Sequence, residues 1–358
     1  MSLALAPGST IGILGGGQLA RMLALAAAPL GLKCHIFAPE TNSPAFQVSA
    51  GHTIAQYTDE MALAKFAAVV DVVTYEFENV PVAAVAFLEK LKPARPGSKA
   101  LAVAQDRLQE KQLAREMGAM TAQFASVNSL DELQNAVQKI GLPAILKTTR
   151  LGYDGKGQVK LSNVDDIEPA WAVMRNQPAI LESFVEFDRE ISVICARGVD
   201  GAFAAYEPTE NVHRNHILHI STVPAQIDDM LAIEAVYLAQ RMAETLDYVG
   251  VMAVEFFVGH GSLNVNEIAP RVHNSGHWTQ DACVVSQFEQ HIRAVAGWPL
   301  GATTRHSDVV MTNLLGDEAA AWETLADEPN LGLHLYGKEE SRPGRKMGHY
   351  NRITPRQR

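Results

Sequence analysis

Two glutamates lie in strand-like runs on either side of a short glycine turn. Glu255 belongs to the run from Val251 to Val258, and Glu267 belongs to the run from Leu263 to Ile268. The residues between the runs include Gly259-His260-Gly261. A hairpin centred near the last of these glycines places the two carboxylates opposite each other on one face. Such a pair is destabilising unless a cation lies between them, so the pattern predicts a magnesium site, whereas a register shifted by one residue would turn the side chains to opposite faces.

A lysine ends an apolar run shortly before a glycine-rich loop. The run is Leu142 to Leu146, the lysine is Lys147, and the loop is Gly152-Tyr153-Asp154-Gly155-Lys156-Gly157-Gln158. Lysine is uncommon in an apolar strand unless its amine has a partner, and the backbone N–H groups of a glycine loop can wrap phosphates. The alternatives are a lysine at a sheet edge and a plain hairpin turn. Together with the paired glutamates, these features predict a site for a magnesium nucleotide.

Composition limits the class of protein. A length of 358 residues exceeds what one core supports, so we expect two or three domains. The formal charge of −10 disfavours a nucleic-acid-binding protein, which needs a basic face. Three scattered cysteines, Cys34, Cys195 and Cys283, form no zinc or disulfide motif and favour a reducing cytoplasm. The longest apolar stretch, around Leu19 to Leu32, is too short to cross a bilayer, and the N-terminus has no basic leader, so we expect neither a membrane partner nor secretion.

The first hundred residues alternate strand-like and helix-like runs. Strands are predicted at Ile11 to Leu14, Lys33 to Phe37 and Val69 to Tyr75, with a helix over Gln18 to Ala28. Strand, helix and strand in this order imply a parallel sheet with crossover connections. We therefore expect an α/β protein whose residues 1–99 form a Rossmann-like domain.

Two segments that contain proline and glycine divide the rest of the chain. Lys92 to Ser98 precedes a long helical pattern over Ala100 to Met117, and Pro299 to Ser307 has the composition of a second linker. We expect a central domain over residues 100–298 and a small C-terminal domain over residues 299–358.

A glycine pattern after the first strand, Gly15-x-Gly17-x-x-Ala20, fits the dinucleotide fingerprint of dehydrogenases, with Glu40 near the expected acidic position. Pro39 and the placement of Glu40 beyond the second strand weaken that interpretation. The helix N-terminus after Gly17 can still bind one phosphate.

Two polar clusters occur late in the chain. The first follows the second glutamate strand and comprises Arg271, His273, Asn274 and Ser275. The second lies near the C-terminus and comprises Lys338, Arg342, Arg345 and Lys346. A capped loop and a solvated basic loop are the alternatives. Because arginine suits bidentate binding of phosphate or carboxylate, this local positive charge in an acidic chain nevertheless suggests an anionic ligand.

Several longer motifs run through the chain from Ile11 to about His349. They are Ala104-Gln105-Asp106-Arg107, the Lys147 strand, GYDGKGQ, LESFVEFDRE, VMAVEFF, NEIAPRVHNSGHW and RPGRKMGH. These motifs resemble the ATP-grasp ligases and, more closely, the 5-(carboxyamino)imidazole ribonucleotide synthetases of purine biosynthesis. The resemblance implies an ATP-grasp domain with a lid over about residues 119–185. It also implies ATP-dependent carboxylation of 5-aminoimidazole ribonucleotide with bicarbonate through carboxyphosphate, Mg²⁺ or Mn²⁺ as the metal, and a homodimer.

The resemblance assigns a nucleotide site. Arg107 and Lys147 would contact phosphates under the lid loop from Gly152 to Gln158, and Glu255 and Glu267 would hold the metal. The other nucleotide contacts would be Glu182, Ser183, Phe184 and Val185 at the adenine, Glu190 at the ribose, and His213 and Asn266.

The resemblance also assigns an acceptor site for the ribonucleotide. Gly17 and Gln18 would lie at its phosphate, and Glu76 and Glu78 would make polar contacts to its sugar or ring. Asp154 on the lid loop would orient the reacting amine or act as its base, and further catalytic groups would be Arg271, Lys338 and Arg345. The full set of remaining ribonucleotide contacts would be Arg271, His273, Asn274, Ser275, Lys338, Arg345 and Lys346.

Three alternatives remain open. Another ATP-grasp ligase, such as a formate-using ribonucleotide transformylase, would require formate in place of bicarbonate. A nucleotide-binding regulatory module would bind ATP without turnover. A dehydrogenase would bind a nicotinamide cofactor.

Overall fold

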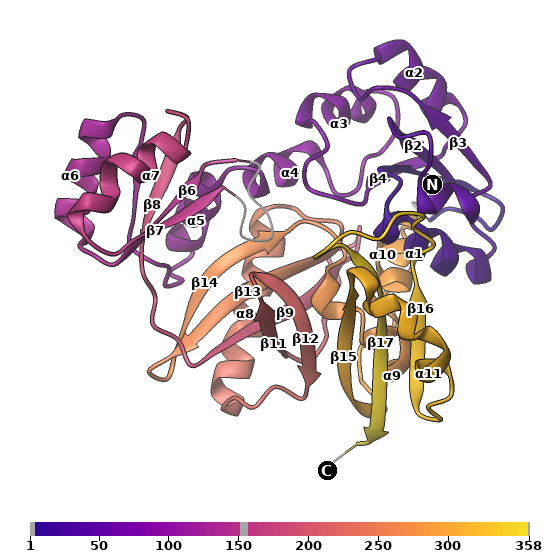
Figure 1. Cartoon of the computed structure of the whole chain (residues 1–358). Helices are drawn as coiled ribbons and strands as arrows, with labels where there is room; N and C mark the ends of the chain where they lie inside the picture. The colour runs from indigo at the N-terminus through magenta and orange to yellow at the C-terminus, as the bar shows by residue number, and fades with distance from the viewer. Residues whose placement is uncertain (1–3, 151–156, 357–358) are drawn as a thin grey trace.

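The N-terminal part of the chain forms a parallel sheet. The computed structural model describes residues 4–150 and 157–356. Its first sheet has the order β3-β2-β1-β4, and all neighbours are parallel. The elements are β1 (Thr10–Leu14), α1 (Gln18–Ala27), β2 (Lys33–Ala38), β3 (Gly51–Ile54), α2 (Glu60–Ala68), β4 (Val72–Tyr75) and α3 (Val82–Glu89). The predicted α/β class and N-terminal parallel sheet are confirmed (Figure 1).

A large antiparallel sheet runs through the rest of the molecule. Among the described residues its order is β14-β13-β9-β11-β12-β15-β17-β16, with β10 beside β9. Its strands are β9 (Arg189–Arg197), β10 (Phe203–Ala205), β11 (Thr209–Arg214), β12 (Ile217–Val223), β13 (Gly250–Gly259), β14 (Ser262–Ala269), β15 (Ser307–Leu315), β16 (Leu331–Leu335) and β17 (Lys346–Pro355). The helices of this part are α8 (Asp229–Thr245), α9 (Thr279–Ala282), α10 (Gln287–Ala296) and α11 (Trp322–Ala326). Because β15 pairs with β12, the small C-terminal part extends the central sheet and has no separate sheet within the described residues.

A third sheet forms a lobe of its own, which lies at the upper left of Figure 1. Its order is β5-β8-β6-β7, with all neighbours antiparallel. The elements are β5 (Phe124–Val127), α6 (Leu130–Ile140), β6 (Ala144–Thr148), β7 (Gln158–Leu161), α7 (Ile167–Val173) and β8 (Ala179–Ser183). This lobe has a separate apolar core that includes Leu133, Leu146 and Trp171. It lies within the range expected for the lid, about residues 119–185.

The helical pattern over Ala100 to Met117 is two helices and not one. They are α4 (Ser98–Ala104) and α5 (Arg107–Glu116). Asp106 lies between them in an extended conformation, with φ −127° and ψ 104°, and its carboxylate accepts hydrogen bonds from the amides of Leu108 and Gln109. An aspartate in this position caps the second helix and ends the first, which apolar periodicity alone does not reveal.

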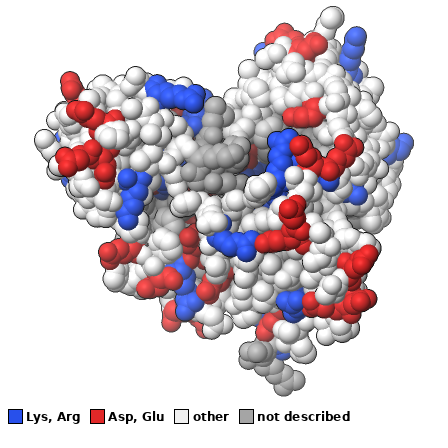
Figure 2. Space-filling view, viewed as in Figure 1, with Lys and Arg blue, Asp and Glu red and all other residues white. Residues whose placement is uncertain are grey.

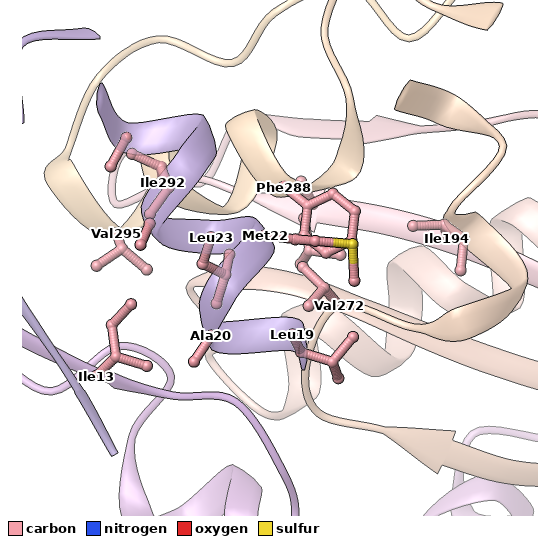
Figure 3. Packing of buried hydrophobic residues seen from close by; sticks show 14 of the residues in the cluster. Ile13, Leu19, Ala20, Met22, Leu23, Ile194, Val272, Phe288, Ile292 and Val295 are labelled. Carbon is pink, nitrogen blue, oxygen red and sulfur yellow. The ribbon is translucent and has the colours of Figure 1, made fainter. Parts of the chain in front are cut away.

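A shared apolar core joins the parallel-sheet domain to the large sheet. Leu19 and Leu23 of α1 belong to one buried cluster with Phe288 and Ile292 of α10 (Figure 3). The indole Nε1 of Trp298 donates to the Leu5 carbonyl oxygen at 2.7 Å across the same boundary. Each fully buried side chain of this size contributes about 1.5–3 kcal/mol, so the contact holds the two parts firmly together.

The outer surface carries mixed charge. On the face drawn in Figure 2, Lys and Arg side chains are interspersed with Asp and Glu, and the surface is hollowed between the two upper lobes. Among the described residues, no helix combines the length and apolar character needed to span a membrane.

Candidate active site

A cavity of about 860 Å³ lies where the parallel sheet, the third-sheet lobe and the large sheet meet. Its walls bring together residues that are far apart in the sequence. Of the predicted site residues it is lined by Gln18, Glu76, Glu78, Arg107, Lys147, Gln158, Glu182, Ser183, Phe184, Val185, Glu190, His213, Glu255, Asn266, Glu267, Arg271, His273, Asn274 and Lys346. We call the part of the wall with the predicted nucleotide residues the nucleotide end and the part with the predicted acceptor residues the acceptor end.

The nucleotide end contains a buried acid with an available oxygen. Glu182, on β8, is 3% exposed, and its Oε2 lies 2.8 Å from Lys147 Nζ and 3.7 Å from Lys111 Nζ. Burial raises the pKa of Glu182, but the two lysines lower it more, so the carboxylate stays charged. Its Oε1 has no hydrogen-bond partner among the described residues. The exocyclic amine of adenine would satisfy this acceptor. Lys147, which is predicted to contact a phosphate, is paired with Glu182 in this structure.

A histidine and a glutamate face each other on neighbouring strands of the large sheet. Glu190 of β9 and His213 of β11 approach to 3.0 Å between Oε2 and Nδ1. Burial lowers the pKa of His213, but Glu190 and, more weakly, Glu255 outweigh it, so the net shift is upward. The predicted ribose and nucleotide contacts thus lie side by side.

Glu255 and Glu267 are directly opposite each other, as the turn predicts. Glu255 lies 3.1 Å from His273 Nε2, and Glu267 lies 3.2 Å from Arg107 Nη1. Each carboxylate therefore faces a nitrogen group. Paired carboxylate oxygens from adjacent strands are a suitable donor set for Mg²⁺, although no cluster of three or more His, Cys, Asp or Glu ligands occurs among the described residues.

The turn between the two strands differs in one respect from the prediction. Its central residues are His260 and Gly261, with φ values of 52° and 71°, so the hairpin is centred slightly earlier than expected. A register shift next to Glu255 compensates, because Phe256 pairs with Val265 while Glu255 pairs with Glu267. The extra residue in this β-bulge is Asn266.

Ser275 lies beneath the cavity and not at its surface, which corrects its predicted substrate contact. Its side chain is fully buried, and its Oγ lies 2.8 Å from His273 Nδ1 and 2.6 Å from Ser192 Oγ. The side-chain Nδ2 of Asn211 donates to Ser192 Oγ at 2.9 Å and continues this chain of hydrogen bonds. Ser275 therefore holds the imidazole of His273 against Glu255 and has no access to a ligand.

The glycine turn after β1 accommodates a carboxylate. The amide of Gly17 donates to Glu76 Oε1 at 2.5 Å, and the amide of Ala20 donates to Glu76 Oε2 at 2.9 Å. A Cβ at Gly17 would lie 2.6 Å from Glu76 Oε1, and one at Gly15, where φ is +99°, would lie 2.5 Å from Glu76 Cγ. The absence of a side chain at Gly15 and Gly17 therefore leaves the space that the Glu76 side chain fills. Because the Gly17 amide donates to Glu76 here, its contact to the ribonucleotide phosphate stays a prediction.

Arg271 pairs with Glu78 at the acceptor end. The guanidinium Nε donates to Glu78 Oε2. Burial raises the pKa of Glu78, but Arg271 lowers it more, to about 2. The carboxylate therefore stays charged and fixes the guanidinium at the cavity wall.

The basic loop before β17 lies close by. Lys346 lines the cavity. Lys338 Nζ donates to the Lys346 carbonyl oxygen at 2.6 Å, and Arg345 Nη1 donates to the Glu340 carbonyl oxygen at 2.7 Å. Neither Lys338 nor Arg345 lines the cavity here, so their contacts to the ribonucleotide remain predictions.

Comparison with known proteins identifies the family. Residues 8–105 match the ribonucleotide synthetase preATP-grasp domain, residues 112–288 match the ATP-grasp domain, and residues 309–358 match the phosphoribosylaminoimidazole carboxylase C-terminal domain. An N5-carboxyaminoimidazole ribonucleotide synthase from Brucella melitensis is 53% identical over 355 residues, which cover 98% of both chains. The chain belongs to the N5-carboxyaminoimidazole ribonucleotide synthase family.

Solved structures of this family have the same fold. An ADP complex of an N5-carboxyaminoimidazole ribonucleotide synthetase is 43% identical, with a TM-score of 0.95 over 99% of this chain and 94% of that one. A synthase from Aspergillus clavatus in complex with ADP and 5-aminoimidazole ribonucleotide is 31% identical, with a TM-score of 0.90 over 97% and 94%.

Some predicted site residues lie outside the described residues, and other charged residues near the cavity carry no signal in the sequence. The predicted lid-loop residues outside the described residues are Gly152, Tyr153, Asp154, Gly155 and Lys156. Gly157 and Gln158 are described, and Gln158 pairs with Lys147 at the cavity wall. Sequence reasoning missed Glu110 and Lys111, which are charged residues within an ordinary helical pattern and which only their burial distinguishes.

We expect ribonucleotide binding to weaken as the pH rises through about 8. Burial, followed by repulsion from Arg345, lowers the pKa of Lys338 to about 8. The ammonium group predicted to meet the phosphate is therefore present below that pH and lost above it. At saturating ATP, kcat/KM for the ribonucleotide should fall between about pH 7 and about pH 9. In K338R the fall should move to higher pH because arginine stays charged, and an unchanged profile would contradict the assignment.

Proposed function

We propose that the protein carboxylates 5-aminoimidazole ribonucleotide with bicarbonate and ATP. The products are N5-carboxyaminoimidazole ribonucleotide, ADP and phosphate, as the family's place in purine biosynthesis requires. Bicarbonate attacks the γ-phosphate to form carboxyphosphate, and the exocyclic amine of the ribonucleotide then takes the carboxyl group. The observation that carries this proposal is one cavity that joins an adenine acceptor, a pair of facing carboxylates and a fixed arginine.

The nucleotide half binds and orients ATP. Glu182 Oε1 accepts from the adenine amine, and Lys147 and Arg107 neutralise phosphate charge. Glu255 and Glu267 would hold Mg²⁺, or Mn²⁺ in its place, which when bound supplies further neutralisation of the phosphates. The reaction then depends mainly on alignment and charge compensation in a site that excludes water.

The acceptor half holds the carboxyl donor and the ribonucleotide. Arg271, fixed by Glu78, offers its guanidinium to bicarbonate and carboxyphosphate. Lys346, with Lys338 and Arg345 nearby, attracts the ribonucleotide phosphate. Asp154, outside the described residues, is proposed to orient the amine or to act as its base. Because carboxyphosphate hydrolyses readily, closure by the lobe above the cavity protects it.

Omission of single substrates tests this proposal. ADP should be released at the full rate only when both bicarbonate and the ribonucleotide are present. Bicarbonate is the phosphoryl acceptor, and the ribonucleotide is the carboxyl acceptor. Formate dependence would favour a transformylase, and ATP binding without ADP release under any condition would favour a regulatory module. Both outcomes would refute carboxylation.

Assembly and location are also part of the proposal. A homodimer rests on the family resemblance, and light scattering that gives the mass of one chain would refute it. A cytoplasmic location agrees with the free, buried thiols of Cys34, Cys195 and Cys283.

A further inference from the structure

The facing positions of Glu255 and Glu267 depend on one extra residue. From the turn, the pairs Val258 with Leu263 and Phe256 with Val265 follow a regular register. Continued without interruption, that register would place Asn266 opposite Glu255 and would turn Glu267 to the other face of the sheet. The β-bulge at Asn266 prevents this. Whatever holds the bulge therefore holds the pair of carboxylates.

Two consecutive side chains of α5 bind the backbone around this bulge. Lys111 Nζ donates to the carbonyl oxygens of Val265 and Asn266, at 3.3 Å and 2.8 Å. Glu110 Oε1 accepts from the amide of Ile268. Strand β14 is the edge of the large sheet, so these groups face away from β13. The amide of Val265 on the same edge donates to the Met120 carbonyl oxygen at 2.8 Å. Together with that contact, the two side chains take the place of a neighbouring strand at the point where the register changes.

The environment of Glu110 and Lys111 is unusual for charged side chains. Each is only 2% exposed, and burial of such groups is costly unless they are bound. Burial, with a contribution from Glu267, raises the pKa of Glu110 to about 8. Lys111 also lies 3.7 Å from Glu182, so one lysine contacts both the bulge and the proposed adenine acceptor.

We propose that Glu110 and Lys111 are positioning residues that hold the Asn266 bulge and thereby set Glu255 and Glu267 on one face. Both act on the metal pair through the backbone of the bulge, and Glu110 also lies at the cavity wall. Their effect on metal binding rests on the proposed function, whereas their effect on the register does not. The two parts can therefore be tested separately.

Engineered cysteine pairs measure the register directly. In E255C/E267C the two thiols lie opposite each other and should form a disulfide on mild oxidation, whereas E255C/N266C reports the slipped register and should cross-link poorly. Adding E110A or K111M to each pair should reduce the first cross-link and increase the second. Unchanged cross-linking in both backgrounds would overturn the proposal.

Binding of Mn²⁺ to the full chain in the presence of ADP supplies the second measurement. E110A and K111M should weaken Mn²⁺ binding about 10- to 100-fold, which is typical of residues that support metal ligands. E110Q should bind Mn²⁺ nearly as the parent does, because its amide oxygen can still accept from Ile268. E116A, which removes an exposed carboxylate from the same helix, is the matched control.

The outcomes distinguish the positioning role of Glu110 and Lys111 from the metal-binding role of Glu255 and Glu267. If E110Q loses as much Mn²⁺ affinity as E110A, the hydrogen bond to Ile268 is not the cause and the inference fails. If E255Q binds Mn²⁺ as the parent does, the metal assignment fails instead, while the cross-linking result still decides the role of Glu110 and Lys111.

Discussion

Replacing Glu255 or Glu267 with glutamine should lower kcat by about three orders of magnitude, equivalent to ~4 kcal/mol of transition-state stabilisation. The reason is that glutamine keeps the shape of the side chain but removes the charge that holds the cation beside the phosphates. Some stability should also be lost, because in the folded chain Glu255 faces His273 Nε2 and Glu267 faces Arg107 Nη1. ADP release at saturating substrates and thermal unfolding measure the two effects.

A third glutamate of the large sheet provides the control. Glu210, on β11, pairs with Arg189 at 2.8 Å and does not line the cavity. E210Q should leave turnover near that of the parent. Turnover within a few fold of the parent in E255Q and E267Q would remove the metal assignment, and comparable losses in all three variants would show that the assay reports general damage to the sheet.

Replacing Arg271 with methionine should have the largest effect on stability. The change leaves Glu78 charged in a largely buried position without its partner. Breaking a buried pair from one side costs about 3–5 kcal/mol, and because the Glu78 side chain is 27% exposed we expect the lower part of that range. Urea unfolding of R271M measures the loss. E78Q/R271M should recover most of it, since no unpaired charge remains.

The pH dependence of this loss follows from the pKa of Glu78. In the parent that pKa is lowered from 4.5 to about 2, so the pair contributes stability above about pH 4.5 and loses it as the pH falls toward 2. In R271M, burial without the arginine raises the pKa of the carboxyl. The variant should therefore approach the stability of the parent as the pH falls below about 5. A difference that stays constant with pH would show that the loss comes from packing.

Patterns within one element were predictable from the sequence. The hairpin and the parallel sheet follow from alternation and turn residues. The opposition of Glu255 and Glu267 was predicted from a turn centred near Gly261, but in the structure it depends on the bulge next to Glu255. The bulge at Asn266 was not predictable, because it is held by side chains of α5 that are more than a hundred and fifty residues away. A register that depends on such distant contacts leaves no local pattern.

Burial also distinguishes residues that line the cavity from residues that support them. Arg271, His273 and Ser275 form one polar cluster in the sequence, yet Ser275 points into the protein and supports His273. The glycines after β1 fit a phosphate-binding fingerprint, yet their space is taken by the Glu76 carboxylate. In both cases the residue type indicated a polar or phosphate contact, but the residue that makes the contact, Ser192 or Glu76, comes from another part of the chain.

The position of β17 has a consequence for synthesis of the protein. It pairs with β15 on one side and β16 on the other, although both precede it in the chain. On the ribosome, the edge of β15 therefore stays unpaired until residues through Pro355 have emerged. A nascent chain therefore exposes the unpaired backbone N–H and C=O groups of β15 late in translation, when chaperones would have to shield them from neighbouring polypeptides.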